Sequence, residues 1–228
     1  MDTNYKIYIL GKGFVATHLK KHFQKKLCNS IEKADIVINT IGILKEEKYT
    51  YEDSHINILK NLIPALKNKK LIHFSALGTQ KGHPSKYKHT KAIGEEIIKT
   101  NLKNYAILKP SIILGEGQKL YDDLKRFKNF PIILAPKMKV APVEIDKIIK
   151  KTDEIIKNDL IGEFELCGKE MSMKELFKKV FKSFNKNPLI IEMPKWYFKV
   201  MLPFLNAFKI LSKDEYLMIE DNICKGEK

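Results

Sequence analysis

The feature that most constrains the fold is a regular alternation of short apolar runs with amphipathic segments in the first half of the chain. Apolar runs rich in β-branched residues predict strands, and the segments between them carry apolar residues at helical spacing. The predicted strands are 6–10, 35–43, 70–76 and 105–108, and the predicted helices are 14–27, 54–67 and 86–100. Since the strands are apolar along nearly their whole length, this order predicts a parallel sheet with helices on both faces.

The second half alternates less regularly. Its predicted elements are helices at 143–157, 173–184 and 196–211 and strands at 163–167 and 189–192. Capping boxes at Ser172–Glu175 and Ser212–Glu215 mark the starts of two of its helices. We therefore expect an α/β protein with a Rossmann-like nucleotide-binding core at 1–140 and a small α+β cap that packs on it at 141–228.

A glycine-rich turn follows the first predicted strand and opens the first predicted helix. Its sequence, GKGFVA, fits the pattern G-x-G-x-x-A. The first glycine permits a tight turn, the second lets the backbone approach a pyrophosphate, and the alanine allows close packing of helix on strand. The helix N-terminus would face the anion. We expect a dinucleotide here, bound by Gly11, Lys12, Gly13, Phe14, Val15 and Ala16; the alternative is a purely structural turn.

The segment after this helix is too short for the strand that usually holds the adenosine. An acidic residue about 20 residues beyond the glycines, at the end of a second strand, usually binds the ribose. Only residues 28–34 separate the first helix from the next predicted strand. Glu32 and Asp35 lie near the expected distance, but neither ends a second strand. The sequence therefore predicts a core that has lost this strand, and it shows no preference between NAD and NADP.

Tyr87 and Lys91 have the spacing of a tyrosine and a lysine that act together on one helix face. The charge of such a lysine lowers the pKa of the tyrosine, which can then exchange a proton with substrate. The same lysine holds the ribose of the cofactor, so we also expect Lys91 to bind the dinucleotide. The same spacing occurs at three other places in this lysine-rich chain, so position must select the pair. Ser75 ends the third predicted strand, and Tyr87 begins the helix that follows it.

We therefore predict Ser75, Tyr87 and Lys91 as a catalytic set; the alternative is a vestigial site. Asn39 and Gly42 follow the second predicted strand and would line the same crevice, because ligands of open parallel sheets bind at the carboxyl ends of strands.

Longer stretches around these residues resemble a known family. HFSALGTQKGHPSKYKHTKAIGEEIIK (73–99) and YAILKPSIILGEG (105–117) are similar to the atypical short-chain dehydrogenases/reductases. This NAD-dependent epimerase/dehydratase-like group includes the Rossmann accessory subunit of respiratory complex I. DSHIN (53–57), APVEIDK (141–147) and DEYLMIEDNI (214–223) match the same group.

The resemblance implies NAD(P) binding at the glycine turn and a catalytic role for the serine, tyrosine and lysine already named. It also places Pro110 and Ser111 beside the nicotinamide. Two features depart from the family, whose glycine turn is usually G-x-x-G-x-x-G and whose adenosine strand is present. Some of its members are oxidoreductases, and others are structural subunits or redox-sensing regulators.

Two functions follow from these observations. The first is an NAD(P)-dependent oxidoreductase or epimerase-like enzyme that acts on a small carbonyl or alcohol substrate, with Tyr87 moving the proton. The alternative is a non-catalytic accessory or assembly protein linked to a respiratory or quinone-biosynthesis complex. Loss of the adenosine strand would leave 6–10 at a sheet edge, where a protein partner or a second copy in a homo-oligomer could pair.

The net charge of +15 comes almost entirely from lysine, since Arg126 is the only arginine. The planar fork of arginine is the usual tool for reading phosphates and base edges, so the composition argues against nucleic acid and for a solvated lysine-rich surface. Residues 196–211 combine aromatic residues with lysines, which suits a helix lying on a membrane surface. The alternative is that this stretch packs as the core of the cap.

Cys28, Cys167 and Cys224 lie far apart, with neither metal-ligand nor redox spacing. We expect three free thiols and no metal site. No apolar run approaches the roughly 20 residues of a membrane-spanning helix, and the first residues lack the pattern of a signal peptide. We therefore expect a cytoplasmic protein, either fully soluble or peripheral to the inner face of the membrane.

Overall fold

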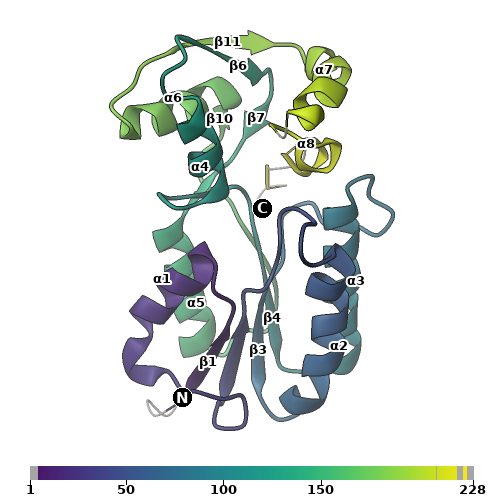
Figure 1. Ribbon diagram of the computed structural model, residues 1–228. Coiled ribbons are helices and arrows are strands. Elements are labelled where there is room, and N and C mark those ends of the chain that lie inside the picture. Colours follow the sequence, from purple (N-terminus) through teal and green to yellow (C-terminus); the bar gives the residue numbers. More distant parts are fainter. Residues whose placement is uncertain (1–4, 209, 220–222, 225–228) are drawn as a thin grey trace. The chain divides into compact units, whose positions relative to one another are not determined.

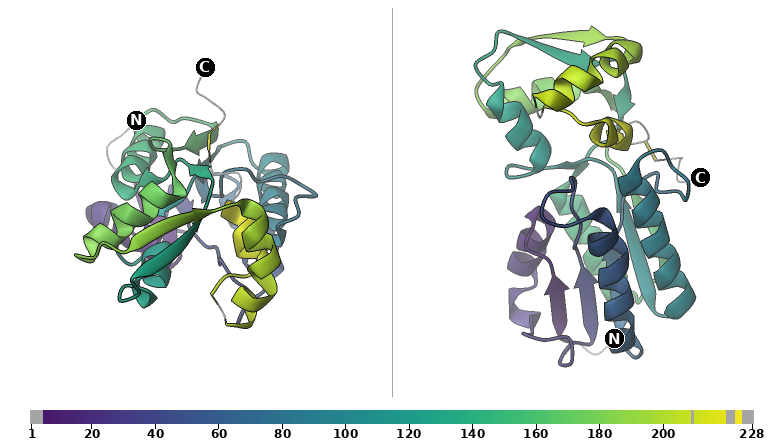
Figure 2. Two further views of the ribbon diagram at one scale, coloured as in Figure 1. Left: turned by 90° about the horizontal axis from the view of Figure 1, so that it is seen from above. Right: turned by 45° about the vertical axis from the view of Figure 1, so that its right-hand side comes forward.

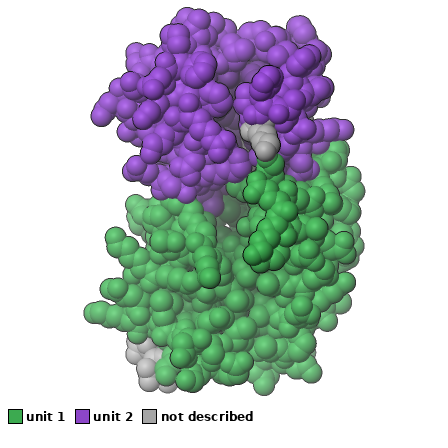
Figure 3. All heavy atoms as spheres, viewed as in Figure 1, with its two compact units in different colours: residues 1–110, 145–166 green, residues 111–144, 167–228 purple. Residues whose placement is uncertain are grey.

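The computed structural model describes residues 5–208, 210–219 and 223–224 (Figure 1). The chain divides into two compact units (Figure 3). Unit 1 comprises 1–110 and 145–166, and unit 2 comprises 111–144 and 167–228. This division differs from the expected one at residue 140, because the chain returns to unit 1 to add the last strand of its sheet.

Unit 1 is built on a five-stranded sheet in the order β1-β2-β3-β4-β9. Every neighbouring pair is parallel, and β2 and β3 are buried along their whole length. This confirms the predicted α/β fold with a parallel sheet. The strands are Ile7–Leu10 (β1), Ile36–Asn39 (β2), Lys70–Phe74 (β3), Tyr105–Pro110 (β4) and Gly162–Leu166 (β9).

Helices cover both faces of this sheet (Figures 1 and 2). Helix α1 (Phe14–His22) packs with α5 (Ile145–Lys157) on one face. Helix α2 (Ile58–Leu62) packs with α3 (Lys86–Asn101) on the other. One core cluster between α2, α3 and the sheet includes Val37, Leu59, Leu62, Leu66, Leu71, Ile98 and Ile107.

The segment predicted as one helix at 54–67 is helical but irregular. It starts with a π-helical turn at Asp53–Asn57 (η2), continues as α2, and ends in a 3-10 turn at Ile63–Leu66 (η3). Pro64 lies in the first turn of η3, where its missing amide costs no helical hydrogen bond. π-Turns are rare and occur frequently at functional sites, and η2 supplies a side chain of the candidate site.

Strand β1 forms an edge of the sheet over the described residues, as the sequence predicted. After α1 and a 3-10 turn at Gln24–Lys26 (η1), the chain makes one parallel bridge, between Leu27 and Ile7. The Cys28 amide donates to the Ile7 carbonyl at 2.9 Å. The chain then turns into β2, so a single bridge occupies the far side of β1.

Unit 2 has a separate core and consists, over its described residues, of small two-stranded sheets and helices. Its core cluster includes Leu114, Leu124, Val140, Leu176, Val180, Phe181 and Ile190. The sheets pair Ile113–Leu114 (β5) with Val143–Glu144 (β8), Ile132–Pro136 (β6) with Leu189–Met193 (β11), and Lys139–Val140 (β7) with Met171–Ser172 (β10). The helices are Lys119–Arg126 (α4), Met173–Ser183 (α6), Lys195–Ala207 (α7) and Lys213–Ile219 (α8).

Both predicted capping boxes form in unit 2. The Ser172 hydroxyl accepts from the Glu175 amide at 3.1 Å, and the Glu175 carboxylate accepts from the Ser172 amide at 2.6 Å. The equivalent bonds of Ser212 and Glu215 are 3.2 and 2.8 Å. The sequence prediction missed α4 and β6 and had no strand at β7 or β10.

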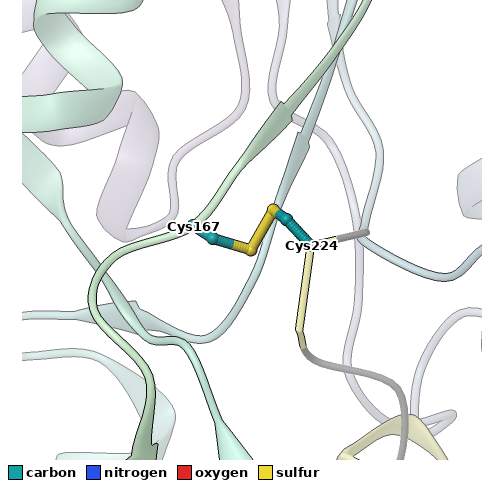
Figure 4. The surroundings of a disulfide bond; sticks show 2 residues. All are labelled: Cys167 and Cys224. Carbon is teal, nitrogen blue, oxygen red and sulfur yellow. A yellow bond between two sulfur atoms is a disulfide. The ribbon is translucent and has the colours of Figure 1, made fainter. Parts of the chain in front are cut away.

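Cys167 and Cys224 form a disulfide within unit 2 (Figure 4), which corrects the expectation of three free thiols. Their Cα atoms lie 5.9 Å apart although 57 residues separate them in the chain, and a disulfide requires only such spatial proximity. Sequence spacing could not reveal it. Cys28 is not disulfide-bonded. None of the described helices is long and apolar enough to cross a membrane.

Candidate functional site

The glycine turn after β1 requires its first glycine for two physical reasons. Gly11 has φ +118°, a backbone conformation that L side chains rarely adopt. A Cβ atom there would also overlap Oγ1 of Thr40. Thr40 directly follows β2, and its hydroxyl donates to the Leu10 carbonyl at 2.7 Å. The turn is therefore pressed against the end of the neighbouring strand, with no space for a side chain.

Unlike Gly11, Gly13 has open space beside its α-carbon. It is exposed and caps the N-terminus of α1, and no atom lies within 4 Å of a Cβ built on it. The cap has no side-chain hydrogen bond, and the first turn of α1 holds no acidic residue. The backbone amides of this turn, which helices leave without intrahelical partners, are therefore available to an anion. Buried Ala16 gives the close helix packing that the motif predicts.

The loop after β2 brings Gly42 over two polar side chains. A Cβ atom on exposed Gly42 would lie 3.0 Å from Lys91 Nζ and 3.8 Å from His55 Nε2. Asn39, which ends β2, is fully buried, and its Oδ1 accepts from the Ile41 amide at 3.0 Å. Its Nδ2 has no hydrogen-bond partner among the described residues. Asn39 and Gly42 thus lie where the sequence placed them, at the carboxyl end of β2.

Lys91 reaches from α3 to the ends of two strands. Its side chain is buried, and Nζ donates to the Phe74 carbonyl at 2.9 Å and to the Ile41 carbonyl at 3.4 Å. Burial lowers the pKa of Lys91 to about 8, against the opposing charge of Glu95. The ammonium is therefore close to losing its proton at neutral to mildly alkaline pH, which suits a group that responds to a ligand.

His55 is a site residue that the sequence analysis missed. It comes from the π-turn η2, and its ring lies edge-on to Tyr87 and stacked on Tyr51, with centroids 5.2 and 5.5 Å away. Its Nε2 is buried without a hydrogen-bond partner among the described residues. Burial, together with the charges of Lys91 and His73, lowers the pKa of His55 to about 2, so the imidazole is neutral.

The tautomer of His55 is coupled to the Thr90 hydroxyl. Nδ1 lies 2.9 Å from this hydroxyl, whose single proton is also within reach of the backbone carbonyls of Lys86 and Tyr87, at 2.9 and 3.1 Å. When the proton points to one of these carbonyls, Nδ1 of His55 donates to Thr90. Nε2 is then an unprotonated acceptor on the side of Gly42. Nothing in the sequence around His55 reveals this contact, because Thr90 lies 35 residues away.

Tyr87 lies in the first turn of α3, which Ser85 caps by accepting from the Lys88 amide at 3.3 Å. Its nearly buried ring contacts His55 and, edge-on at 5.8 Å between centroids, Tyr51. The structure thus brings Tyr87 together with His55, and His55 together with Lys91.

Ser75 follows β3 as predicted, but its hydroxyl donates to Oε1 of buried Glu95. Thr79 donates to the same oxygen at 2.6 Å, and Lys109 forms an ion pair with the other carboxylate oxygen at 2.8 Å. Lys109 also pairs with Glu163 on β9. Burial lowers the pKa of Lys109, but the carboxylates of Glu163 and Glu95 outweigh it and raise that pKa above its ordinary value. Glu95 was not predicted.

The two residues that the resemblance places beside the nicotinamide fall in different units. Pro110 ends β4 in unit 1, and its carbonyl accepts from the Leu77 amide at 3.0 Å. Buried Ser111 belongs to unit 2. Over the described chain, no group of three or more His, Cys, Asp and Glu side chains is arranged to hold a metal ion.

Two relatives of the chain are named as subunits of NADH dehydrogenases. The 40 kDa subunit of NADH-ubiquinone oxidoreductase from Neurospora crassa is 24% identical over 196 residues, which cover 82% of this chain and 52% of that protein. Subunit 9 of the NADH dehydrogenase 1 alpha subcomplex from Arabidopsis thaliana is 25% identical, with coverage of 71% and 44%. The chain thus spans about half the length of these relatives.

Solved structures match the fold at low identity. A dTDP-4-dehydrorhamnose reductase of Bacillus anthracis in complex with NADP has a TM-score of 0.72 and 15% identity, with 86% of each chain covered. Its counterpart from Clostridium acetobutylicum has a TM-score of 0.73 and 14% identity, covering 95% of this chain and 98% of the other.

Residues 15–151 match the family described as "Male sterility protein". This match covers more than half of the chain and includes α1 from its second residue, the strands β2, β3 and β4, and the segment that carries Tyr87 and Lys91. The chain therefore belongs to this NAD-binding, epimerase/dehydratase-like Rossmann family.

Proposed function

We propose that unit 1 binds NAD or NADP and that the chain is an oxidoreductase or epimerase-like enzyme acting on a small carbonyl or alcohol substrate. One observation carries this proposal: three features lie together at the carboxyl ends of the parallel strands. They are the glycine turn after β1, Gly42 after β2, and the contact of Lys91 with the Phe74 carbonyl at the end of β3. Ligands of open parallel sheets bind at the carboxyl ends of the strands.

The residues present fit the parts of a dinucleotide. The open surface at Gly13 and the first-turn amides of α1 suit a pyrophosphate. Lys91 is a donor and Nε2 of His55 is an acceptor, both beneath Gly42, and a ribose diol offers the complementary pair of hydroxyl groups. Lys12, Phe14 and Val15 belong to the same turn. A bound nicotinamide dinucleotide would supply the hydride acceptor or donor.

Tyr87 is the proposed group that gives or takes the proton of the substrate oxygen. Lys91 lies one helical turn away, and its positive charge stabilises a phenolate. Ser75 is proposed to hold the substrate carbonyl. To donate there, its hydroxyl must turn away from Glu95, which holds it in this structure.

A non-catalytic accessory role is the second candidate, and two observations favour it. Glu95 occupies the only proton of the Ser75 hydroxyl, and the far side of β1 carries a single bridge where the adenosine strand would run. The named subunits of NADH dehydrogenase to which the chain is similar make a protein partner the natural expectation in that case, with homo-oligomerisation as the alternative. Contact with a membrane through 196–211 is a separate proposal that depends on unit 2.

Titration with NADH and NADPH, followed by nicotinamide fluorescence, tests cofactor binding. We expect micromolar affinity for at least one of them. Gly13→Asp should weaken it by at least about tenfold, because a carboxylate would face the pyrophosphate at the helix N-terminus. Gln24→Glu is the matched control, since it adds the same charge at an exposed position on η1. If neither dinucleotide binds, the enzymatic proposal fails and the accessory role takes its place.

Oxidation of the preferred dinucleotide with a panel of small aldehydes and ketones tests catalysis. Tyr87→Phe should lower turnover by about 100-fold or more while leaving dinucleotide affinity nearly unchanged. Tyr105→Phe is the control, because Tyr105 and Lys109 have the same spacing but lie on β4. Binding without turnover, or turnover that does not depend on Tyr87, would favour the accessory role.

A further inference from the structure

Helix α7 is apolar on two opposite sides. One side of the helix carries buried Phe198 and half-buried Leu202 and Leu205. Its outer side carries Trp196, Val200, Phe204 and, at the C-cap, Phe208, whose exposed fractions lie between 60% and 77%. We call these four residues the α7 stripe. A surface helix normally has one apolar face, and a second one indicates a further apolar environment.

A second exposed apolar surface lies on the neighbouring sheet. Helix α6 packs on one face of the β6–β11 sheet. The other face carries two aliphatic cross-strand pairs, Ile132 with Leu189 and Leu134 with Ile191, with exposed fractions between 39% and 61%. We call these four residues the sheet quartet. Helix α7 follows β11 after Pro194 and lies beside it in both views of Figure 2.

The charges around these two surfaces are nearly all positive. Residues 127–139 contain no acidic residue, and 186–208 contain only Glu192. Lys137, Lys186 and Lys199 are exposed beside the apolar side chains. A hollow at the start of the sheet, before β6 and β11, is lined by Lys128, Phe130 and Lys186 together with neutral residues. Within these two segments, apolar side chains and lysines thus adjoin with Glu192 as the single carboxylate in the sequence.

We propose that unit 2 docks on an anionic membrane surface through the α7 stripe and the sheet quartet. Aromatic and aliphatic side chains would enter the interface between headgroups and acyl chains, and the lysines would meet lipid phosphates. The charge favours lipid over the other occupants. Lysine is depleted from protein–protein interfaces, and a symmetric contact between two copies would bring the same lysines together.

Sedimentation with phosphatidylcholine vesicles, with and without phosphatidylglycerol, tests the proposal on the full chain. Trp196 is the only tryptophan and belongs to the α7 stripe, so its emission reports insertion directly. We expect the protein to sediment with the anionic vesicles, with a blue shift of Trp196 emission, and to bind neutral vesicles far more weakly. Raising the salt concentration should weaken the binding, because the lysine contribution is screened.

Two pairs of variants separate the apolar and the charged contributions. Phe204→Ser with Phe208→Ser should lower vesicle affinity by at least about tenfold, since two exposed aromatic side chains lose their apolar environment. Lys186→Gln with Lys199→Gln should lower it by roughly 30-fold, because each lysine near an anionic surface contributes about 1 kcal/mol. Lys60→Gln with Lys67→Gln removes the same charge from exposed positions of unit 1 and should have little effect.

Three results would overturn the proposal. The first is an absence of binding to anionic vesicles. The second is an equal loss of binding in the two lysine pairs, or none in the phenylalanine pair, which would mean that net charge alone attracts the protein. The third is a dimer in solution that shields Trp196 from a soluble quencher and shifts its emission without vesicles, which would assign both surfaces to a second copy.

Discussion

The buried ammonium of Lys91 makes the stability of unit 1 depend on pH in a direction that can be worked out. Burial lowers the pKa of Lys91 from its ordinary value of 10.5 to about 8. Between these values the unfolded chain holds the proton and the folded chain releases it. The free energy of unfolding therefore rises with pH above about 8. Below pH 8 both states are protonated, and the folded state bears the whole cost of the buried charge.

The magnitude follows from the gap between the two pKa values. One pKa unit corresponds to about 1.4 kcal/mol, so the full effect is roughly 3 kcal/mol, and about 2 to 3 kcal/mol of it falls between pH 7 and pH 10. Lys91→Met keeps the length of the side chain and removes the titrating group. It also leaves the Phe74 carbonyl without its donor, at a cost of about 1–3 kcal/mol that does not vary with pH.

The measurement is urea denaturation, followed by circular dichroism at several pH values between 7 and 10. Other groups titrate in this range, so the informative quantity is the difference in free energy of unfolding between the wild type and Lys91→Met. As the pH rises from 7 to 10, the wild type should gain about 2–3 kcal/mol in free energy of unfolding relative to Lys91→Met.

Lys60→Met, at an exposed position of α2, is the matched control and should follow the wild type. A difference between the wild type and Lys91→Met that stays flat from pH 7 to pH 10 would refute the reasoning, because it would mean that the folded and unfolded chains bind the same number of protons at this lysine.

Three further predictions concern stability. Gly11→Ala should destabilise the chain by about 2–4 kcal/mol in thermal or urea unfolding, from its positive φ and its overlap with Thr40, whereas Gly13→Ala should cost no more than about 1 kcal/mol; equal effects would contradict the assigned roles. Glu95→Gln should lower the free energy of unfolding by about 3 kcal/mol, because it removes a buried partner of Lys109. Glu96→Gln should lower it by less than about 0.5 kcal/mol, because Glu96 pairs with Lys81 at an exposed position. Cys167→Ser should destabilise unit 2 by about 2–4 kcal/mol, read from Trp196 fluorescence, while Cys28→Ser should not; three reactive thiols in the unfolded, unreduced wild type would contradict the disulfide.

The sequence predicted those parts of the fold that depend on local chemistry. The segments that form β1 to β4 are apolar runs, so their composition already predicts that they are buried. Both capping boxes can be read in the sequence as a serine followed three residues later by a glutamate. α4 was missed because it brings only Tyr121 and Leu124 to the core from an otherwise charged segment. β6 was missed because its two faces are both apolar, so the alternation typical of a half-buried strand is absent.

In the candidate site, too, the sequence predicted only the features that depend on local chemistry. The glycine turn and the choice of Tyr87 followed from their positions after strands. Glu95, in contrast, stands beside Glu96 in a helix rich in lysine and glutamate, and nothing in that pattern distinguishes the buried carboxylate from the exposed one. The buried carboxylate is identified only by its tertiary contacts: Glu95 pairs with Lys109 of β4 and accepts from Ser75, which follows β3.

These contacts divide the site into a part that lacks partners and a part that is complete. Nε2 of His55 and Nδ2 of Asn39 are buried polar atoms without hydrogen bonds among the described residues, and such atoms cost about 1–3 kcal/mol each. A ligand that satisfies them would recover some of that energy. Around Ser75, Glu95 already accepts from the hydroxyls of Ser75 and Thr79 and pairs with the Lys109 ammonium. Binding of a dinucleotide should therefore stabilise the folded chain whether or not Ser75 is released for catalysis, because the two parts of the site draw on different contacts.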